Sequence, residues 1–236
     1  MTSLLTPQRR RGHEILDDPE VDDELRARSL ADVARSNTMF GGSRAVQAEL
    51  ATALGNSAAK QVSLLDVGTG IGDIPARAKE TWRANGLAIT AYGIDICPSL
   101  LRDARASGLI PICADARALP IASKSVDIVI CSQTLHHFEA ADAIAVLREL
   151  DRVARVRVIV SDIRRSWLAA AGIWLASYPL RFHPVSRHDG VVSVLRGFTP
   201  AELSQLVQRA TKQTPVARRR IGFRTTASWI PGTLAA

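Results

Sequence analysis

Residues 64–73 read LLDVGTGIGD, and this stretch constrains the fold more than any other. The apolar residues before Gly68 are typical of a buried strand, and glycines at positions 68, 70 and 72 indicate a tight turn that leads into a helix. Glycine leaves room for a ligand near the backbone, and the amides at the start of the helix face that ligand. The stretch therefore predicts a strand, turn and helix that hold a nucleotide-like ligand.

The spacing of the glycines separates two kinds of nucleotide site. The dinucleotide pattern G-x-G-x-x-G needs a glycine where this chain has Asp73, and the third glycine comes one residue early, at Gly72. The pattern D-x-G-x-G-x-G, which starts at Asp66, resembles the first motif of class I S-adenosylmethionine (SAM) methyltransferases. An ordinary α/β turn without a nucleotide is the alternative at this point.

Length and composition bound the class of protein. The chain has 236 residues, which fits one α/β domain, or one domain with a small cap. No apolar run reaches the length of a membrane span, and the N-terminal residues lack a secretory apolar region, so we expect a cytoplasmic protein. Its cysteines, Cys97, Cys113 and Cys131, form no C-x-x-C pair, so we expect buried thiols and no metal site.

The net charge of +7 invites a nucleic-acid hypothesis. However, the arginines are spread along the chain, with small clusters only at residues 9–11 and 218–220. Aromatic residues make up 5% of the chain, which leaves little material for base stacking. The balance favours a solvated surface and a small-molecule partner, with nucleic acid as the alternative.

Strands and helices alternate through the middle of the chain. We expect strands at 62–67, 88–94, 110–114, 126–131 and 156–161, and helices at 73–85, 98–107 and 140–153. Continuous apolar strands joined by helices indicate a parallel sheet covered on both faces. The expected fold class is therefore α/β, with a Rossmann-like sandwich.

The N-terminal segment, residues 1–57, is expected to form a helical cap in front of a catalytic domain at 58–236. Within the cap we expect residues 1–18 to be frayed, with helices at 22–37 and 43–54. A pocket or lid element is expected at about 164–198, with an apolar helix at 167–180 and a loop at 181–197.

The last part of the chain begins at a capping box, in which Thr199 and Glu202 start a helix that runs to about Ala210. Two short strands, near 216–220 and 223–229, follow this helix. Such a terminal pair after five parallel strands resembles the seven-stranded methyltransferase sheet, whose last strand inserts antiparallel.

Acidic residues end two of the expected strands. Asp95 follows the second strand, and a carboxylate there accepts ribose hydroxyls in nucleoside-binding folds. Its neighbour Ile96 would then contact the same nucleoside. The resemblance to class I methyltransferases implies that Asp115, after the third strand, reaches the adenine amino group and that the Ala116 amide reaches a ring nitrogen. An ordinary strand-end carboxylate is the alternative for Asp95.

Residues 132–138, which read SQTLHHF, resemble the x-L-H-H-F segment of small-molecule methyltransferases. The resemblance places Ser132 and His137 beside the methionine part of SAM, and makes His136 a candidate base. Packing at the start of a helix is the alternative for both histidines, because only geometry identifies a base. The Asn/Asp-Pro-Pro-Tyr/Phe box of enzymes that methylate nucleic-acid amino groups is absent.

Together these motifs cover about residues 60–165 and identify the chain as similar to class I SAM methyltransferases. The segment NTMFGGSR at 37–44 also resembles ubiquinone- and menaquinone-biosynthesis methyltransferases, which implies that Arg44 pairs with the SAM carboxylate. A surface arginine is the alternative. The full set expected to bind the cofactor is Asp66, Gly68, Thr69, Gly70, Gly72, Asp95, Ile96, Asp115, Ala116, Ser132, His137 and Arg44.

The methyl acceptor is indicated less directly. His188, Asp189 and Gly190 resemble a segment of bacterial methyltransferases that act on phenolic or quinone-like metabolites, which makes His188 a second candidate base. A simple turn at Asp189 and Gly190 is the alternative.

We therefore expect SAM-dependent O-methylation of a small, hydrophobic phenolic or quinol-like acceptor. The alternatives are C-methylation of a quinol-like ring, a nucleic-acid methyltransferase, an NAD-dependent oxidoreductase and a non-enzymatic SAM-binding partner protein.

Overall fold

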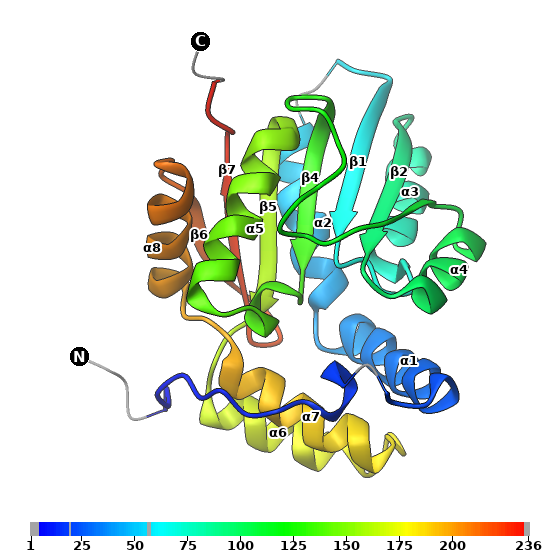
Figure 1. The fold of residues 1–236 in the computed structure, drawn as a ribbon, viewed down its shortest axis with the longest axis vertical. Helices are drawn as coiled ribbons and strands as arrows, with labels where there is room; N and C mark the ends of the chain where they lie inside the picture. The colour runs from blue at the N-terminus through cyan, green and yellow to red at the C-terminus, as the bar shows by residue number, and fades with distance from the viewer. Residues whose placement is uncertain (1–4, 19, 56–57, 234–236) are drawn as a thin grey trace.

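A computed structural model of the protein describes residues 5–18, 20–55 and 58–233. Its centre is a seven-stranded sheet in the order β3-β2-β1-β4-β5-β7-β6 (Figure 1). The strands are β1 (Gln61–Val67), β2 (Ala88–Asp95), β3 (Ile110–Cys113), β4 (Val126–Ser132), β5 (Ala154–Ile163), β6 (Val216–Arg220) and β7 (Arg224–Trp229). Strands β1 to β5 pair in parallel, and β7 is antiparallel to both β5 and β6. The predicted Rossmann-like methyltransferase sheet is confirmed.

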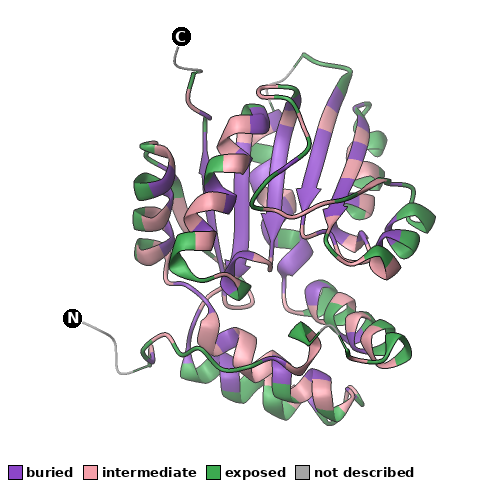
Figure 2. Cartoon of the chain, viewed as in Figure 1, coloured by how far each residue is buried: buried purple, intermediate pink, exposed green. Residues whose placement is uncertain are grey.

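Helices cover both faces of the sheet. One face carries α2 (Gly42–Leu54), α3 (Asp73–Ala84) and α4 (Pro98–Ala106), and the other carries α5 (Ala140–Val153) and α8 (Pro200–Thr211). Alternate residues of a strand point to opposite faces, so Leu64 packs with α2 and α3 while Leu65 packs with α5 and α8. The central strands β1, β4, β5 and β7 are accordingly buried along most of their length, whereas the edge strands β3 and β6 are not (Figure 2).

A third layer lies across the carboxyl ends of the parallel strands (Figure 1). It comprises α1 (Asp23–Met39), α6 (Trp167–Ser177) and α7 (Pro184–Arg196), with the short 3-10 helices η1 (Ile15–Asp17) and η2 (Leu135–His137) beside it. The strand order reverses at β1, which lies between β2 and β4, and ligands bind outside the strand ends at such a switch point. None of the helices in the described residues is long and apolar enough to span a bilayer.

The prediction of a loop at 181–197 is wrong, because α7 occupies it. The His183 side chain accepts a hydrogen bond from the Val185 amide, and Pro184 stands in the first turn, so the helix has a well-formed start. Gly190 does not break the helix; a β-carbon there would lie 3.2 Å from Ile173 on α6, so the small residue lets the two helices approach.

The prediction of a frayed N-terminus is wrong for residues 5–18, which we call the strap; residues 1–4 lie outside the described residues. The strap runs along α7 (Figure 1) and is fixed by backbone bonds, including one from the Arg10 amide to the Leu195 carbonyl. The Asp189 carboxylate accepts the Ile15 and Leu16 amides, each at 2.9 Å. The division into a cap at 1–57 and a catalytic domain from residue 58 stays a prediction. Helix α2, which this division assigns to the cap, packs in the core of the sandwich.

Candidate functional site

The glycine turn after β1 has the left-handed backbone that its sequence predicts. Gly68, Gly70 and Gly72 have φ values of +74°, +54° and +78°. A β-carbon on Gly68 would collide with Thr134, 2.3 Å away, whereas one on Gly70 would meet nothing within 4 Å. Gly70 is therefore the glycine that leaves open space, and it lines a cavity above the turn.

Asp66 supports this turn from beneath. Its side chain is buried and accepts a 2.9 Å hydrogen bond from the Thr69 hydroxyl. Burial raises the pKa of the Asp66 carboxyl to about 8; the Thr69 hydroxyl opposes this rise, and the charges of Asp73 and Asp95 add to it. The carboxyl is therefore protonated at neutral pH and does not supply charge to the cavity.

Two further carboxylates line the cavity next to the turn. Asp95 accepts the Gly70 amide at 2.9 Å and the Cys97 amide at 3.0 Å, so it holds the turn against the end of β2. Asp115 pairs with Arg117 at 2.6 Å, and hydrogen bonds from Arg117 hold the pKa of this carboxyl below its usual value. Ile96 and Ala116 line the same end of the cavity.

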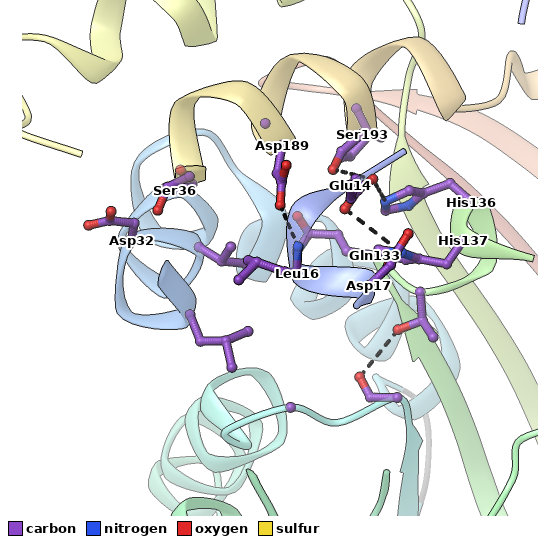
Figure 3. Close-up of a pocket in the computed structure, with 18 of the residues that line it drawn as sticks. Glu14, Leu16, Asp17, Asp32, Ser36, Gln133, His136, His137, Asp189 and Ser193 are labelled. Carbon is purple, nitrogen blue, oxygen red and sulfur yellow. Dashed lines mark hydrogen bonds and ion pairs between the residues drawn. The ribbon is translucent and has the colours of Figure 1, made fainter. Parts of the chain in front are cut away.

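The cavity has a volume of about 940 Å³ and extends from the glycine turn to the cap layer. Figure 3 shows the strap and α7 closing over this second end. The side chains there are largely apolar and come from α1, α6, α7 and neighbouring segments; they include Leu16, Leu30, Val33, Phe40, Ile163, Ile173, Phe182, Val194 and Phe223. One cavity thus joins a polar strand-end region to an apolar chamber.

His136 stands between these two regions, on η2. Its Nδ1 atom lies 2.7 Å from Asp162, whose second oxygen accepts the His136 amide at 3.0 Å. Burial would raise the pKa of Asp162, but the charge and hydrogen bonds of His136 hold it below its usual value. The Nε2 atom has no hydrogen-bond partner among the described residues, and Glu14 of the strap is 3.8 Å away.

His137 also lines the cavity, with its Nδ1 atom 2.9 Å from Asp17 (Figure 3). Burial lowers the pKa of His137, but the hydrogen bond to Asp17 and the charge of Glu14 outweigh it, so the pKa lies above its usual value. His137 is thus paired with the strap through Asp17.

Glu14, His136 and His137 each place one ligand-type atom within 4.8 Å of the others, a spacing that metal sites also show. Here Arg196 faces the same groups: its Nη1 atom is 3.1 Å from Glu14, 2.7 Å from Asp17 and 3.4 Å from the Nδ1 atom of His137. This guanidinium supplies the positive charge that the strap carboxylates need.

The structure does not bring every predicted residue to the cavity. Thr69 and Gly72 belong to the glycine turn and Ser132 ends β4, and none of the three lines the cavity. Arg44 is exposed on α2. His188 bonds Asp189 at 2.8 Å, with about half of its side chain exposed; because neighbouring helix residues point about 100° apart, Asp189 faces inward while His188 does not.

Sequence reasoning missed Glu14, Asp17, Asp162 and Arg224, all of which lie at or beside the cavity. Asp162 stands at the carboxyl end of β5, and the rule that sites form at strand ends would have found it. Arg224 is a buried cation on β7 that donates to Gln133 at 2.6 Å. The strap residues gave no local signal, because their partners lie far away in the sequence.

The sheet order and the antiparallel last strand are those of the Rossmann-like methyltransferase fold, and the glycine turn lies beside a strand-end cavity. Residues 65–160 match the family described as "Methyltransferase domain". Residues 65–160 therefore carry a methyltransferase domain, within a Rossmann-like methyltransferase fold. No curated protein matches its sequence.

Solved structures with the same fold share little sequence with the chain. The plantazolicin methyltransferase BamL, in complex with a triazolic desmethylPZN analog and SAH, has a TM-score of 0.66 and 16% identity over 87% of this chain and 90% of its own. Magnesium protoporphyrin IX methyltransferase (ChlM) from Synechocystis PCC 6803, with SAH, has a TM-score of 0.57 and 16% identity over 91% of this chain and 90% of its own. A Haloferax volcanii methyltransferase in complex with the activator Trm112 has a TM-score of 0.60 and 14% identity over 91% of this chain and 100% of its own.

Proposed function

We propose that the protein transfers a methyl group from SAM to an oxygen of a small hydrophobic acceptor of the phenolic or quinol-like type. The SAM end of the cavity would be formed by Gly68 and Gly70, by the acidic residues Asp95 and Asp115, and by the neighbours Ile96 and Ala116. The open space above Gly70 fits a ligand that presses against the backbone, because any larger side chain would fill it. When bound, SAM supplies an electrophilic methyl group on a positively charged sulfur.

Asp66, Thr69, Gly72 and Ser132 support the cofactor indirectly in this proposal, by fixing the turn and the end of β4. Arg224, rather than Arg44, is the cation whose position suits an anionic group in the cavity, since it lines the cavity and Arg44 does not. His137 would close the boundary between cofactor and strap.

The apolar chamber under α1, α6 and α7 supports a hydrophobic acceptor. Its walls are aromatic and aliphatic, which favours a ligand that buries apolar surface. Polar groups are concentrated around His136 and the strap, which would orient one hydroxyl of the acceptor towards the glycine turn.

The observation that carries the proposal is that one ring nitrogen of His136 pairs with Asp162 and the other has no hydrogen-bond partner among the described residues. Asp162 pairs with the Nδ1 atom, and Nε2 is a buried atom of this cavity-lining residue. We infer that Nε2 carries the free lone pair. An acceptor hydroxyl that donates to Nε2 would satisfy this atom, and His136 would take the proton as the oxygen gains the methyl group; the carbon–sulfur bond of SAM would break and S-adenosylhomocysteine would leave. The buried Asp162 carboxylate stabilises the resulting imidazolium.

C-methylation of a quinol-like ring is the second candidate, because removing the same hydroxyl proton increases the electron density of the ring carbons. Nucleic acid finds less support. Arg218 and Arg220 of one basic cluster pair with buried Glu49 at 3.1 and 2.6 Å, so part of the positive charge is used within the fold.

Incubation of the protein with labelled SAM and a panel of phenols, quinols and RNA tests the acceptor class. On the acceptor so found, His136→Ala should lower turnover by about 10²- to 10⁴-fold, the usual contribution of a general base, with the Kd for SAM unchanged. His188→Ala measures the other candidate base under the same conditions. Unchanged turnover in His136→Ala, or methylation of RNA alone, would refute the proposal.

A further inference from the structure

Helix α6 is apolar on both of its sides. Residues 166–180 contain no Asp, Glu, Lys or Arg. The inner side of the helix contributes Ala169, Gly172 and Ile173 to the cavity lining. The outer side lies at the edge of the molecule farthest from the sheet (Figure 1), so its apolar residues need a separate explanation.

Five large apolar side chains are exposed on this outer side, which we call the α6 outer face. With the exposed percentage of each, they are Trp167 (41%), Leu168 (55%), Trp174 (46%), Leu175 (60%) and Tyr178 (49%). At about 100° per residue these positions fall within roughly one third of the helix circumference. The exposed side chains therefore form one stripe.

The surroundings of the stripe are positively charged. From Arg164 to Phe198 the sequence has five arginines and one acid, Asp189, which is buried. Two of these arginines, Arg165 and Arg196, pair with carboxylates elsewhere in the fold, and the other three are Arg164, Arg181 and Arg187. Arg10 lies over the ring of Trp167 at 5.3 Å, and Arg187 lies over Tyr178 at 3.7 Å. The face thus combines an apolar stripe with cations at both ends.

The positive charge around the α6 outer face indicates what kind of partner binds there. In a symmetric dimer this patch would meet itself, which would bring two arginine-rich rims together without exposed acids between them. An anionic lipid surface instead attracts the arginines, and tryptophan and tyrosine are the side chains that prefer the level of lipid headgroups.

We propose that the protein docks on the surface of an anionic lipid bilayer through the α6 outer face. The helix lies in the plane of the headgroups, and Arg10, Arg181 and Arg187 approach lipid phosphates. The inner side of the same helix walls the apolar chamber, so docking places that chamber next to the membrane. The docking itself does not depend on the acceptor proposed above.

Co-sedimentation with vesicles tests the proposal. The wild-type protein should bind vesicles of phosphatidylcholine and phosphatidylglycerol at least about tenfold more strongly than vesicles of phosphatidylcholine alone, and salt should weaken this preference. Trp174→Ser/Leu175→Ser should lower binding to the anionic vesicles by at least about tenfold. The matched control is Ile230→Ser, which removes an apolar side chain that is 64% exposed beyond the end of β7.

Circular dichroism and SAM affinity of each variant verify the fold. Equal binding by wild type and double variant, or no preference for anionic vesicles, would overturn the proposal. So would a concentration-dependent dimer that the double variant abolishes, since the occupant would then be a second copy. A wild-type protein that fails to bind SAM counts against the proposed function alone, because vesicle binding is read without SAM.

Discussion

Asp66 is a carboxyl group whose cost to the fold depends on pH. Its pKa of about 8 means that the folded protein keeps a proton that the unfolded chain has released above about pH 4. The contribution of Asp66 to the free energy of unfolding therefore falls as the pH rises between about 4 and 8, by about 1.4 kcal/mol per pH unit. The carboxyl stays at this position because it accepts the Thr69 hydroxyl beneath the glycine turn.

Asp66→Asn should remove this pH dependence, since the amide still offers an oxygen to Thr69 and binds no proton. The stability of the variant relative to wild type should increase by about 3 kcal/mol from pH 5 to pH 7, measured by urea unfolding without SAM. Asp103→Asn, at an exposed position on α4, is the control. A relative stability that is the same at both pH values would show that Asp66 is ionised in the fold.

Gly70→Val should weaken SAM binding by at least about a hundredfold, which corresponds to about 2.8 kcal/mol. A branched side chain fits poorly at a φ of +54° and would also occupy the open space above the turn. Gly86→Val separates these two effects, because Gly86 has a φ of +80° and open space but does not line the cavity. Calorimetry should find the affinity of Gly86→Val close to that of wild type. Normal affinity in Gly70→Val would contradict the cofactor site.

At the scale of elements, the strap is held to α7 by several hydrogen bonds, and two of them share the Asp189 carboxylate. Asp189→Ala removes the acceptor of the Ile15 and Leu16 amides. Hydrogen bonds to a charged acceptor contribute about 1.5–3 kcal/mol, so exchange of these two amides should accelerate by at least about tenfold. Hydrogen exchange measured by NMR checks this, with the Leu65 amide in the central sheet as the internal reference. Unchanged exchange at both positions would mean that other contacts fix the strap.

Elements defined by local patterns were predictable from the sequence, and elements defined by distant partners were not. The helix at Ala140–Val153 and the capping box of Thr199 and Glu202 are confirmed, because their signals lie within one or two turns of the chain. The strap is different: Ile15 is fixed by a side chain 174 positions away. No short pattern records such a contact.

The candidate site divides in the same way. Gly70, Asp95 and Asp115 follow strands whose ends meet at one edge of the sheet, so a sequence motif places them together. Glu14 meets His136 only after residues 5–18 have folded back over η2 and α7. The sequence predicts His188 as a base in a loop, but the residue lies on α7, on the side of the helix that faces away from the cavity.

At the scale of the whole molecule, the cofactor region and the acceptor chamber have different origins. The cofactor region is built from consecutive strand ends of the sheet, within the segment that matches the methyltransferase family. The chamber is assembled from the strap, α1, α6 and α7, and none of these four lies inside that segment. We therefore expect the shared fold to serve SAM chemistry and the cap layer to select the acceptor.

A ligand that binds this shared region should stabilise the whole fold. At a SAM concentration one hundred times its Kd, binding to the folded state alone adds about 2.7 kcal/mol to the free energy of unfolding. For a chain of this length that corresponds to a rise in Tm of about 5–10 °C in a thermal-shift measurement. NAD at the same concentration should leave the Tm unchanged, because Asp73 stands where a dinucleotide fingerprint requires glycine. A rise with NAD and none with SAM would reverse the assignment of the glycine turn.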